Sequence, residues 1–210
     1  MSIRRKGIEV IGLTGQTGAG KSTASAYFRE RGCPVIDCDG ISRQVSAPGS
    51  RCLAALTEAF SPAILTPERT LNRKALGGMV FGHPERLARL GEIIFPFILE
   101  ELQRRIRSLE RQGEPLVLLD APTLFESGAD RLCRRILAVT APEEQRLARI
   151  MERDSLTREE ALRRMGSQLP QAYFEEHADF VIENNGGSGE LAEKLARALD
   201  WLREGRDTPA

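Results

Sequence analysis

The stretch GLTGQTGAGKST, at residues 12–23, constrains the fold of this chain more than any other. It fits the pattern G-x-x-x-x-G-K-[ST] of a phosphate-binding loop, because Gly15, Gly20, Lys21 and Ser22 occupy the fixed positions. In such a loop the glycines allow tight turns that bring backbone N–H groups against phosphate oxygens, and the lysine reaches the β- and γ-phosphates. We therefore predict a triphosphate site here, with the Ser22 hydroxyl as a metal ligand. Its predicted contact residues are Gly15, Gly18, Ala19, Gly20, Lys21, Ser22 and Thr23.

The residues on either side of the loop predict the strand and the helix that such a loop requires. The segment IEVIGLT before it is apolar and β-branched, and KSTASAYFRERG after it has helical apolar spacing with Gly32 as a stop signal. Five short apolar runs in all are typical of strands, and helical patterns separate them. These runs are residues 8–14, 34–37, 116–120, 136–140 and 180–183. The alternation predicts an α/β fold, a P-loop kinase-like core of about five parallel strands with helices on both faces.

One connection is much longer than a single crossover helix needs. It runs from Asp39 to Pro115 and contains four helical patterns punctuated by Gly or Pro: SRCLAALTEAF, LNRKALGGMVF, PERLARLGEIIF and PFILEELQRRIRSLERQG. We predict one kinase domain over residues 1–205. Its core takes 7–47 and 114–205, an inserted helical acceptor subdomain takes about 48–113, and an Arg-rich lid takes about 143–170. Residues 206–210 are expected to be a disordered tail.

Composition argues against several classes of partner. Lys and Arg total 30, as do Asp and Glu, so the formal net charge is zero and nothing global indicates a nucleic-acid or membrane partner. No segment approaches the length of a membrane span, and the apolar run after MSIRRKG is far too short for a signal peptide. The four cysteines fit neither a zinc site nor a disulfide scaffold, so we expect reduced thiols in a cytoplasmic protein.

A phosphate-binding core with one helical insertion and one arginine-rich flap is typical of a small kinase. A GTPase is expected to carry N-K-x-D after a later strand, and the sequence has no such motif. Motor ATPases generally need more chain. Two alternatives to the leading interpretation stay open: a kinase for another small metabolite or a nucleoside monophosphate, and an ATP-binding regulatory module that transfers nothing.

Two carboxylates follow the second predicted strand, in VIDCDGISRQV. In an extended chain Asp37 and Asp39 point to the same side. They would stand at the carboxyl end of a strand that we expect beside the phosphate-loop strand, where open α/β sheets bind ligands. Phosphoryl transfer to a hydroxyl needs a proton acceptor, and His83 and His177 lie in no motif, so Asp is the candidate base. The alternative is that these carboxylates only cap the next helix.

The ordered set of motifs resembles the dephospho-CoA kinase family. The set comprises IGLTGQTGAGKST, VIDCDGISRQV, the Pro-Gly pair at 48–49, LNRKAL, PTLFESG, RIMERDSLTREEALRRMGSQ and ADFVIENNG. These stretches run in the family's order from about residue 8 to 187. The resemblance implies ATP-dependent phosphorylation of the ribose 3′-hydroxyl of dephospho-CoA, with ATP and Mg²⁺ at the site. We expect a monomer or a weak homo-oligomer.

The resemblance also implies roles for single residues. Asp39 is implied as the catalytic base, Thr14 falls at an active-site position, and Arg43 lies where the family contacts the acceptor. Lys21 acts on the transferring phosphate as the fixed lysine of the loop. The chain departs from many members at Phe95, which stands before a proline where those members carry histidine, so any polar contact of that histidine is absent.

Three arginines of the predicted lid share one helix face, because Arg146, Arg149 and Arg153 are three and four residues apart. Arginine is suited to bidentate contacts with phosphate oxygens. The alternative is a solvated charged helix, in which Glu143 pairs with Arg146 and Glu152 pairs with Arg149. The resemblance favours Arg149 as a catalytic lid residue over the transferring phosphate.

Two further polar positions are open to two interpretations each. Asp120 closes the apolar strand LVLLD, and it either holds a metal-bound water or is a strand-end turn residue. The segment ENNGG falls where the resemblance places the adenine of ATP, so Asn184 or Asn185 contributes there, or the segment is a plain turn. We take Asn185 as the candidate ATP-binding residue.

Overall fold

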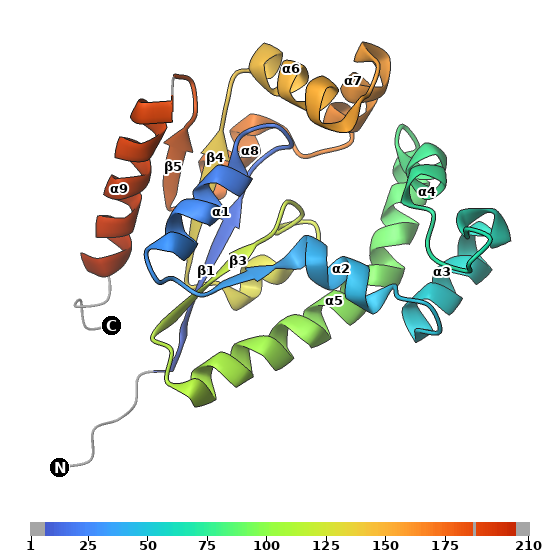
Figure 1. The fold of residues 1–210 in the computed structure, drawn as a ribbon, viewed down its shortest axis with the longest axis horizontal. Helices are drawn as coiled ribbons and strands as arrows, with labels where there is room; N and C mark the ends of the chain where they lie inside the picture. Colours follow the sequence, from blue (N-terminus) through green and yellow to red (C-terminus); the bar gives the residue numbers. More distant parts are fainter. Residues whose placement is uncertain (1–6, 187, 205–210) are drawn as a thin grey trace.

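The computed structural model describes residues 7–186 and 188–204 of the chain. Within this part five strands form one parallel sheet in the order β2-β3-β1-β4-β5 (Figure 1). The strands are β1 (Glu9–Thr14), β2 (Val35–Asp37), β3 (Leu116–Asp120), β4 (Arg135–Thr140) and β5 (Phe180–Glu183). The predicted parallel α/β sheet is confirmed, and each predicted strand lies within one residue of the observed bounds.

One predicted adjacency is wrong, because β2 does not lie beside β1. Strand β3 lies between them, with Asp120 opposite Leu13 of β1 and opposite Asp37 of β2. The first four residues of β3 are all buried, which suits an interior strand covered on both faces. Strand β2 has only three residues and ends in the exposed Asp37, which suits an edge. Asp120 therefore stands between the phosphate-loop strand and the carboxylates that follow β2.

Helices cover both faces of the sheet, and the strands send alternate residues to each (Figure 1). On one face α1 (Lys21–Glu30) and α9 (Ser188–Glu204) pack on a core that includes Ile11 and Leu118. On the other face α2 (Cys38–Val45) and α5 (Pro84–Gln112) pack on a core that includes Val10 and Val117. Helix α8 (Gln171–His177) contacts β4, and the short helix η2 (Ala129–Leu132) adds Ala129 to the second core.

The long connection after β2 is helical, as predicted, but its last two helical patterns form one helix. The helices are α3 (Arg51–Phe60), η1 (Pro62–Ile64), α4 (Arg73–Val80) and the 29-residue α5, which runs through Pro96. A proline inside a helix removes one backbone hydrogen bond and crowds the preceding turn. Buried apolar residues on both sides of Pro96 outweigh that cost, so the interruption expected there is wrong. These residues are Ile93, Ile94, Ile98 and Leu102.

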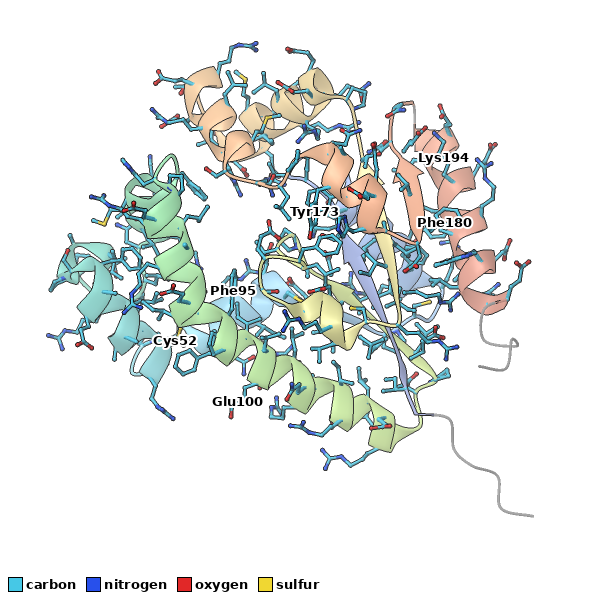
Figure 2. All side chains as sticks on the ribbon, turned by 180° about the vertical axis from the view of Figure 1, so that it is seen from behind. Cys52, Phe95, Glu100, Tyr173, Phe180 and Lys194 are labelled. Atoms are coloured by element: carbon cyan, nitrogen blue, oxygen red, sulfur yellow. The ribbon has the colours of Figure 1, made fainter. Side chains whose placement is uncertain are left out.

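The helical region packs against the sheet through a shared apolar core. Cys52 on α3 and Leu76 on α4 belong to the same buried cluster as Val117 of β3, and Figure 2 shows Cys52 and Phe95 on neighbouring helices of this region. The division of the chain at residues 48–113 stays a prediction. The predicted tail at 206–210 lies outside the described residues. In the described part, no helix combines the length and apolarity that crossing a membrane requires.

The predicted lid contains α6 (Glu143–Asp154) and α7 (Arg158–Gly166). These helices share a small apolar cluster of their own, which includes Leu147 and Met165 and is separate from the two clusters on the sheet. Figure 1 shows them beyond the carboxyl end of the sheet, next to the loop that joins β1 to α1. The lid thus stands over the predicted triphosphate site.

Candidate active site

The phosphate loop turns where β1 ends and α1 begins. Gly15 has a φ of 144° and Gly18 a φ of 78°, which L side chains rarely adopt. A Cβ at Gly15 would collide with the backbone carbonyl of Val139, and one at Gly18 would lie 2.6 Å from the backbone oxygen of Arg146. The loop therefore fits tightly between β4 and the lid helix α6, and both glycines are required by geometry.

Two glutamines fasten the phosphate loop to the segment between α7 and α8. The Gln16 side-chain amide donates to the Leu169 carbonyl at 2.9 Å, and the Thr17 backbone N–H donates to Gln168 Oε1 at 2.9 Å. Gln16 is only 8% exposed. The sequence analysis missed both glutamines. Gln168 lies in a quoted family motif, but no spacing or periodicity connects it with a loop about 150 residues earlier.

The turn after β5 also supports the phosphate loop. Asn184 is buried, and its side-chain amide donates to the Ala19 carbonyl at 2.8 Å. Asn185 is exposed, and its carbonyl accepts a hydrogen bond of 3.2 Å from Gln145 of α6. Ala19 is fully buried, and its backbone N–H donates to the Gln16 carbonyl at 3.1 Å, so its contact with ATP stays a prediction. Asn184 thus shapes the loop, while Asn185 lies at the base of the lid, and its contact with adenine stays a prediction.

The Lys21 ammonium forms an ion pair with the Asp120 carboxylate at the end of β3. Both side chains are largely buried, with 16% and 13% of their surface exposed. The contact places Asp120 inside the phosphate site. It argues against the alternative that Asp120 is only a turn residue at the end of the strand. Thr14, at the end of β1, is fully buried, and its hydroxyl has no hydrogen-bond partner in the described part of the chain. Its catalytic assignment stays a prediction.

The carboxylates after β2 occupy different positions, because α2 begins at Cys38. Asp37 is the N-cap of α2 and accepts from the Gly40 N–H at 3.0 Å, so the expectation that both point the same way along an extended chain is wrong. Asp39 lies in the first turn and is exposed. Among the described residues it has no hydrogen bond or ion pair. Capping is therefore the role of Asp37, which leaves the Asp39 carboxylate available in the cleft.

Cys38, between these two carboxylates, is an unreactive thiol. Burial, with a contribution from the negative charge of Asp120, raises its pKa to about 12. At neutral pH the thiol stays protonated, and a protonated thiol is a poor nucleophile. The structure therefore favours filling of the core over reaction with oxidants as the role of this side chain.

The lid arginines differ in their environments although they share one helix. Arg146 is buried, with Nε donating to the Ala141 carbonyl at 3.1 Å, and burial lowers its pKa. Arg153 pairs with the neighbouring Asp154, at a shortest distance of 2.7 Å. Neither ion pair of the alternative interpretation, Glu143 with Arg146 or Glu152 with Arg149, is present among the described residues.

Within residues 7–186 and 188–204, Arg149 makes hydrogen bonds to uncharged groups alone. It donates to the Gly18 carbonyl at 3.1 Å and to Gln145 Oε1 at 3.2 Å. Its guanidinium thus lies against the phosphate loop without a carboxylate to neutralise it. This is the arrangement expected of an arginine that meets an anion.

One large open cleft, between the sheet edge, the helical region and the lid, brings most of the predicted site residues together. Thr14, Ala19 and Asn185 do not line it. The predicted residues that do line it are Gly15, Gly18, Gly20, Lys21, Ser22, Thr23, Asp39, Arg43, Asp120 and Arg149. Phe95 also lines the cleft.

Comparisons with known proteins agree with this geometry. The family model described as dephospho-CoA kinase matches residues 9–190. A dephospho-CoA kinase from Anaeromyxobacter dehalogenans is 40% identical over 199 residues, which cover 95% of this chain and 94% of the relative. A crystal structure from Thermus thermophilus superimposes with a TM-score of 0.79 at 36% identity, covering 94% of this chain and 98% of that one. Dephospho-CoA kinase from Campylobacter jejuni gives a TM-score of 0.67 at 26% identity with the same coverages.

Proposed function

The chain belongs to the dephospho-CoA kinase family, and we propose that it transfers the γ-phosphoryl group of ATP to the ribose 3′-hydroxyl of dephospho-CoA. The products are coenzyme A and ADP. The observation that carries the proposal is a single cleft that is lined both by a phosphate loop and by Asp39, a carboxylate without a hydrogen bond or ion pair in the described part of the chain. A regulatory module has no use for such a carboxylate, and the family match does not favour a kinase for another acceptor.

The donor side holds the triphosphate of ATP. Gly18, Gly20, Lys21 and Ser22 line the cleft and offer backbone N–H groups to the phosphates, and the α1 N-terminus adds its positive dipole. The Lys21 ammonium leaves Asp120 and contacts the β- and γ-phosphates. Arg149 reaches the same phosphates from the lid and stabilises the negative charge that develops on the transferring group.

The donor side also fits Mg²⁺. The Ser22 hydroxyl and the Asp120 carboxylate are hard oxygen donors, and Mg²⁺ usually takes one or two protein ligands together with phosphate oxygens and water. No three His, Cys, Asp or Glu side chains among the described residues form a metal site by themselves, which agrees with a metal that arrives with the nucleotide. When bound, Mg²⁺ neutralises charge on the phosphate oxygens.

On the acceptor side, Asp39 accepts the proton of the ribose 3′-hydroxyl as that oxygen attacks the γ-phosphorus. The bond between the γ-phosphorus and the bridging oxygen breaks, and ADP leaves. Arg43 is exposed on the next turn of α2 and contacts the acceptor. Asp37 keeps α2 in place by capping it, so that Asp39 stays directed to the cleft.

We also propose that the protein acts in the cytoplasm on small molecules, without nucleic-acid or membrane partners, as a monomer or a weak homo-oligomer. The zero formal net charge supports this. So do the free thiols of Cys38, Cys52 and Cys133, because a reducing compartment preserves thiols.

The test is ADP release with ATP and Mg²⁺, with and without dephospho-CoA, beside AMP, CMP and shikimate as rival acceptors. We expect rapid release only with dephospho-CoA, and a product heavier than it by one phosphoryl group. Faster turnover with a rival acceptor would assign the protein to another kinase class. ATP binding without turnover on any acceptor would favour the regulatory module.

A further inference from the structure

Two arginines line the acceptor side of the cleft. Arg43 projects from α2, and Arg73 is the first residue of α4. The Arg73 guanidinium donates to Ser46 Oγ at 2.9 Å and to the Ser42 carbonyl at 3.4 Å, so it is anchored to the end of α2. Loss of solvent around the guanidinium, and then the positive charge of Arg43, lower the pKa of Arg73. Because Arg73 contacts the carbonyl of Ser42, the residue before Arg43, two like charges lie near each other at the cleft wall.

The protein neutralises this pair only in part. Among the described residues Arg73 forms no ion pair, and Arg43 has one contact of 3.4 Å with Asp37, whose side chain is half exposed and already caps α2. The negative charge of Asp39 acts to raise the pKa of Arg73, but no hydrogen bond joins the two side chains among the described residues. Elsewhere the chain does pair its arginines with carboxylates, at 2.6 to 2.9 Å. Examples are Arg104, Arg105, Arg153 and Arg164.

A negatively charged group of the acceptor balances the positive charges of Arg43 and Arg73. The acceptor is an adenosine whose 5′-carbon carries a diphosphate ester, so two negative charges lie on the same ribose that presents its 3′-hydroxyl to Asp39. A guanidinium matches two phosphate oxygens at once. Arg73 and Arg43 both line the cleft beside Asp39, within the reach of such a ligand.

We propose that Arg73 is an acceptor-binding residue, whose guanidinium acts with that of Arg43 to hold the 5′-diphosphate of dephospho-CoA. This inference rests on the proposed function, and it adds the group of the acceptor that the helical region recognises. Arg73 selects acceptors with a charged 5′-substituent and takes no part in the chemical step.

The test compares steady-state kinetics of the wild type, Arg73→Ala and Arg86→Ala. Arg86 is a matched control, because it is an exposed arginine of the same helical region, its bond is to the Met79 carbonyl at 3.3 Å, and it does not line the cleft. We expect Arg73→Ala to raise the KM for dephospho-CoA about 10- to 100-fold, the usual worth of a hydrogen bond to a charged group. The KM for ATP should change by less than about twofold, as should every constant of Arg86→Ala.

Two further measurements separate recognition of charge from support of the fold. Arg73→Lys keeps the charge and loses the planar fork, so the KM for dephospho-CoA should rise about 3- to 10-fold. This variant keeps the inference testable if Arg73→Ala does not fold. The KM for dephospho-CoA should also depend less steeply on salt concentration in Arg73→Ala than in the wild type, because one screened charge contact is gone.

An unchanged acceptor KM in Arg73→Lys, or an unchanged salt dependence in a folded Arg73→Ala, overturns the inference. Failure of the wild-type protein to phosphorylate dephospho-CoA is a separate result, which overturns the proposed function itself.

Discussion

The two sides of the cleft are built in opposite ways. On the donor side, Gln168 and Asn184 come from distant parts of the chain and hold the phosphate loop by hydrogen bonds of 2.9 and 2.8 Å. On the acceptor side, Asp39 has no protein partner among the described residues, and Arg73 is bonded only to uncharged groups. The chain shapes its phosphate loop itself, whereas under our proposal the acceptor site is completed by the charges of its ligand.

This difference follows from the way in which the protein has to bind each ligand. A phosphate loop works through backbone N–H groups, which reach phosphate oxygens only when the backbone holds one conformation, so pre-organisation improves binding. A base must keep its carboxylate free of competing donors until the hydroxyl arrives. Bonds that would neutralise Asp39 or Arg73 in the free protein would have to break before the acceptor could bind.

The largest effect is expected at the base. Asp39→Asn keeps the size of the side chain and removes its ability to accept a proton, so kcat should fall about 10²- to 10⁴-fold. Asp37→Asn is the matched control. Because asparagine is as good an N-cap as aspartate, it should cost less. Rates of ADP release with saturating ATP and dephospho-CoA measure both variants. Normal turnover by Asp39→Asn would end its assignment as the base.

The next effect separates the lid arginines. Arg149→Ala removes a guanidinium that has only uncharged partners beside the phosphate loop, so kcat should fall about 10- to 100-fold, and more than the acceptor KM rises. Arg153→Ala, on the same helix, removes an arginine that Asp154 already neutralises, and it should change kcat by less than about threefold. A raised acceptor KM with unchanged kcat in Arg149→Ala would move that residue to substrate binding.

A smaller effect tests whether side chains outside the loop shape the donor site. Gln168→Ala deletes the acceptor of the Thr17 N–H, so the KM for ATP should rise about 2- to 10-fold while the KM for dephospho-CoA stays unchanged. Gln171→Ala, three residues later, removes a glutamine whose side chain, in the part of the chain that the structure describes, bonds to the exposed Glu175 alone, and it should leave both constants unchanged. Equal changes in both KM values for Gln168→Ala would mean that its bond supports the whole lid.

The smallest effect concerns stability away from the cleft. Hydrogen bonds from Arg104 and then Arg105 lower the pKa of Glu101 to about 2. Because this folded-state pKa lies below the ordinary value of 4.5, ionised Glu101 stabilises the fold above about pH 4.5, and the contribution is lost as pH falls toward 2. Both arginines are partly exposed, so Glu101→Gln should cost about 1 kcal/mol at pH 7.

Urea unfolding at pH 7 and at pH 3.5 measures this effect as the difference between the wild type and Glu101→Gln. The difference should shrink at the lower pH. Glu100→Gln is the control, because Glu100 is exposed on the same helix and forms no ion pair among the described residues (Figure 2). A difference that stays the same at both pH values would show that charge at Glu101 is not the cause.

The features of the fold that depend on a local sequence pattern were predicted correctly. Each strand followed from a short apolar run, and the phosphate loop followed from glycines whose backbone angles the structure shows to be required. The neighbour of β2 was predicted wrongly, because apolar runs identify buried strands but not their order in the sheet. The start of α2 at Cys38 was also missed, since DCD reads equally well as a strand end and as a helix cap.

Contacts between residues that are far apart in the chain could not be predicted from the sequence. Nothing in the spacing of Gln168 connects it with Thr17, and nothing near Arg73 shows that it would bond to the helix that carries Arg43. Local ion-pair spacing misled as well, because it suggested Glu152 for Arg149, whereas the folded chain turns Arg149 to the Gly18 carbonyl. These are the residues that distinguish the two sides of the cleft, and they come together only through the fold.

The independence of the two sides is tested most directly by the affinity for ATP. Calorimetric titration of ATP and Mg²⁺ into Asp39→Asn should give a Kd within about twofold of the wild type, because the donor site is complete without Asp39. Lys21→Ala, which removes the lysine of the phosphate loop, should bind ATP about 10- to 100-fold more weakly. If Asp39→Asn weakens ATP binding as much as Lys21→Ala does, the donor and acceptor sides are one coupled site, and the account is contradicted.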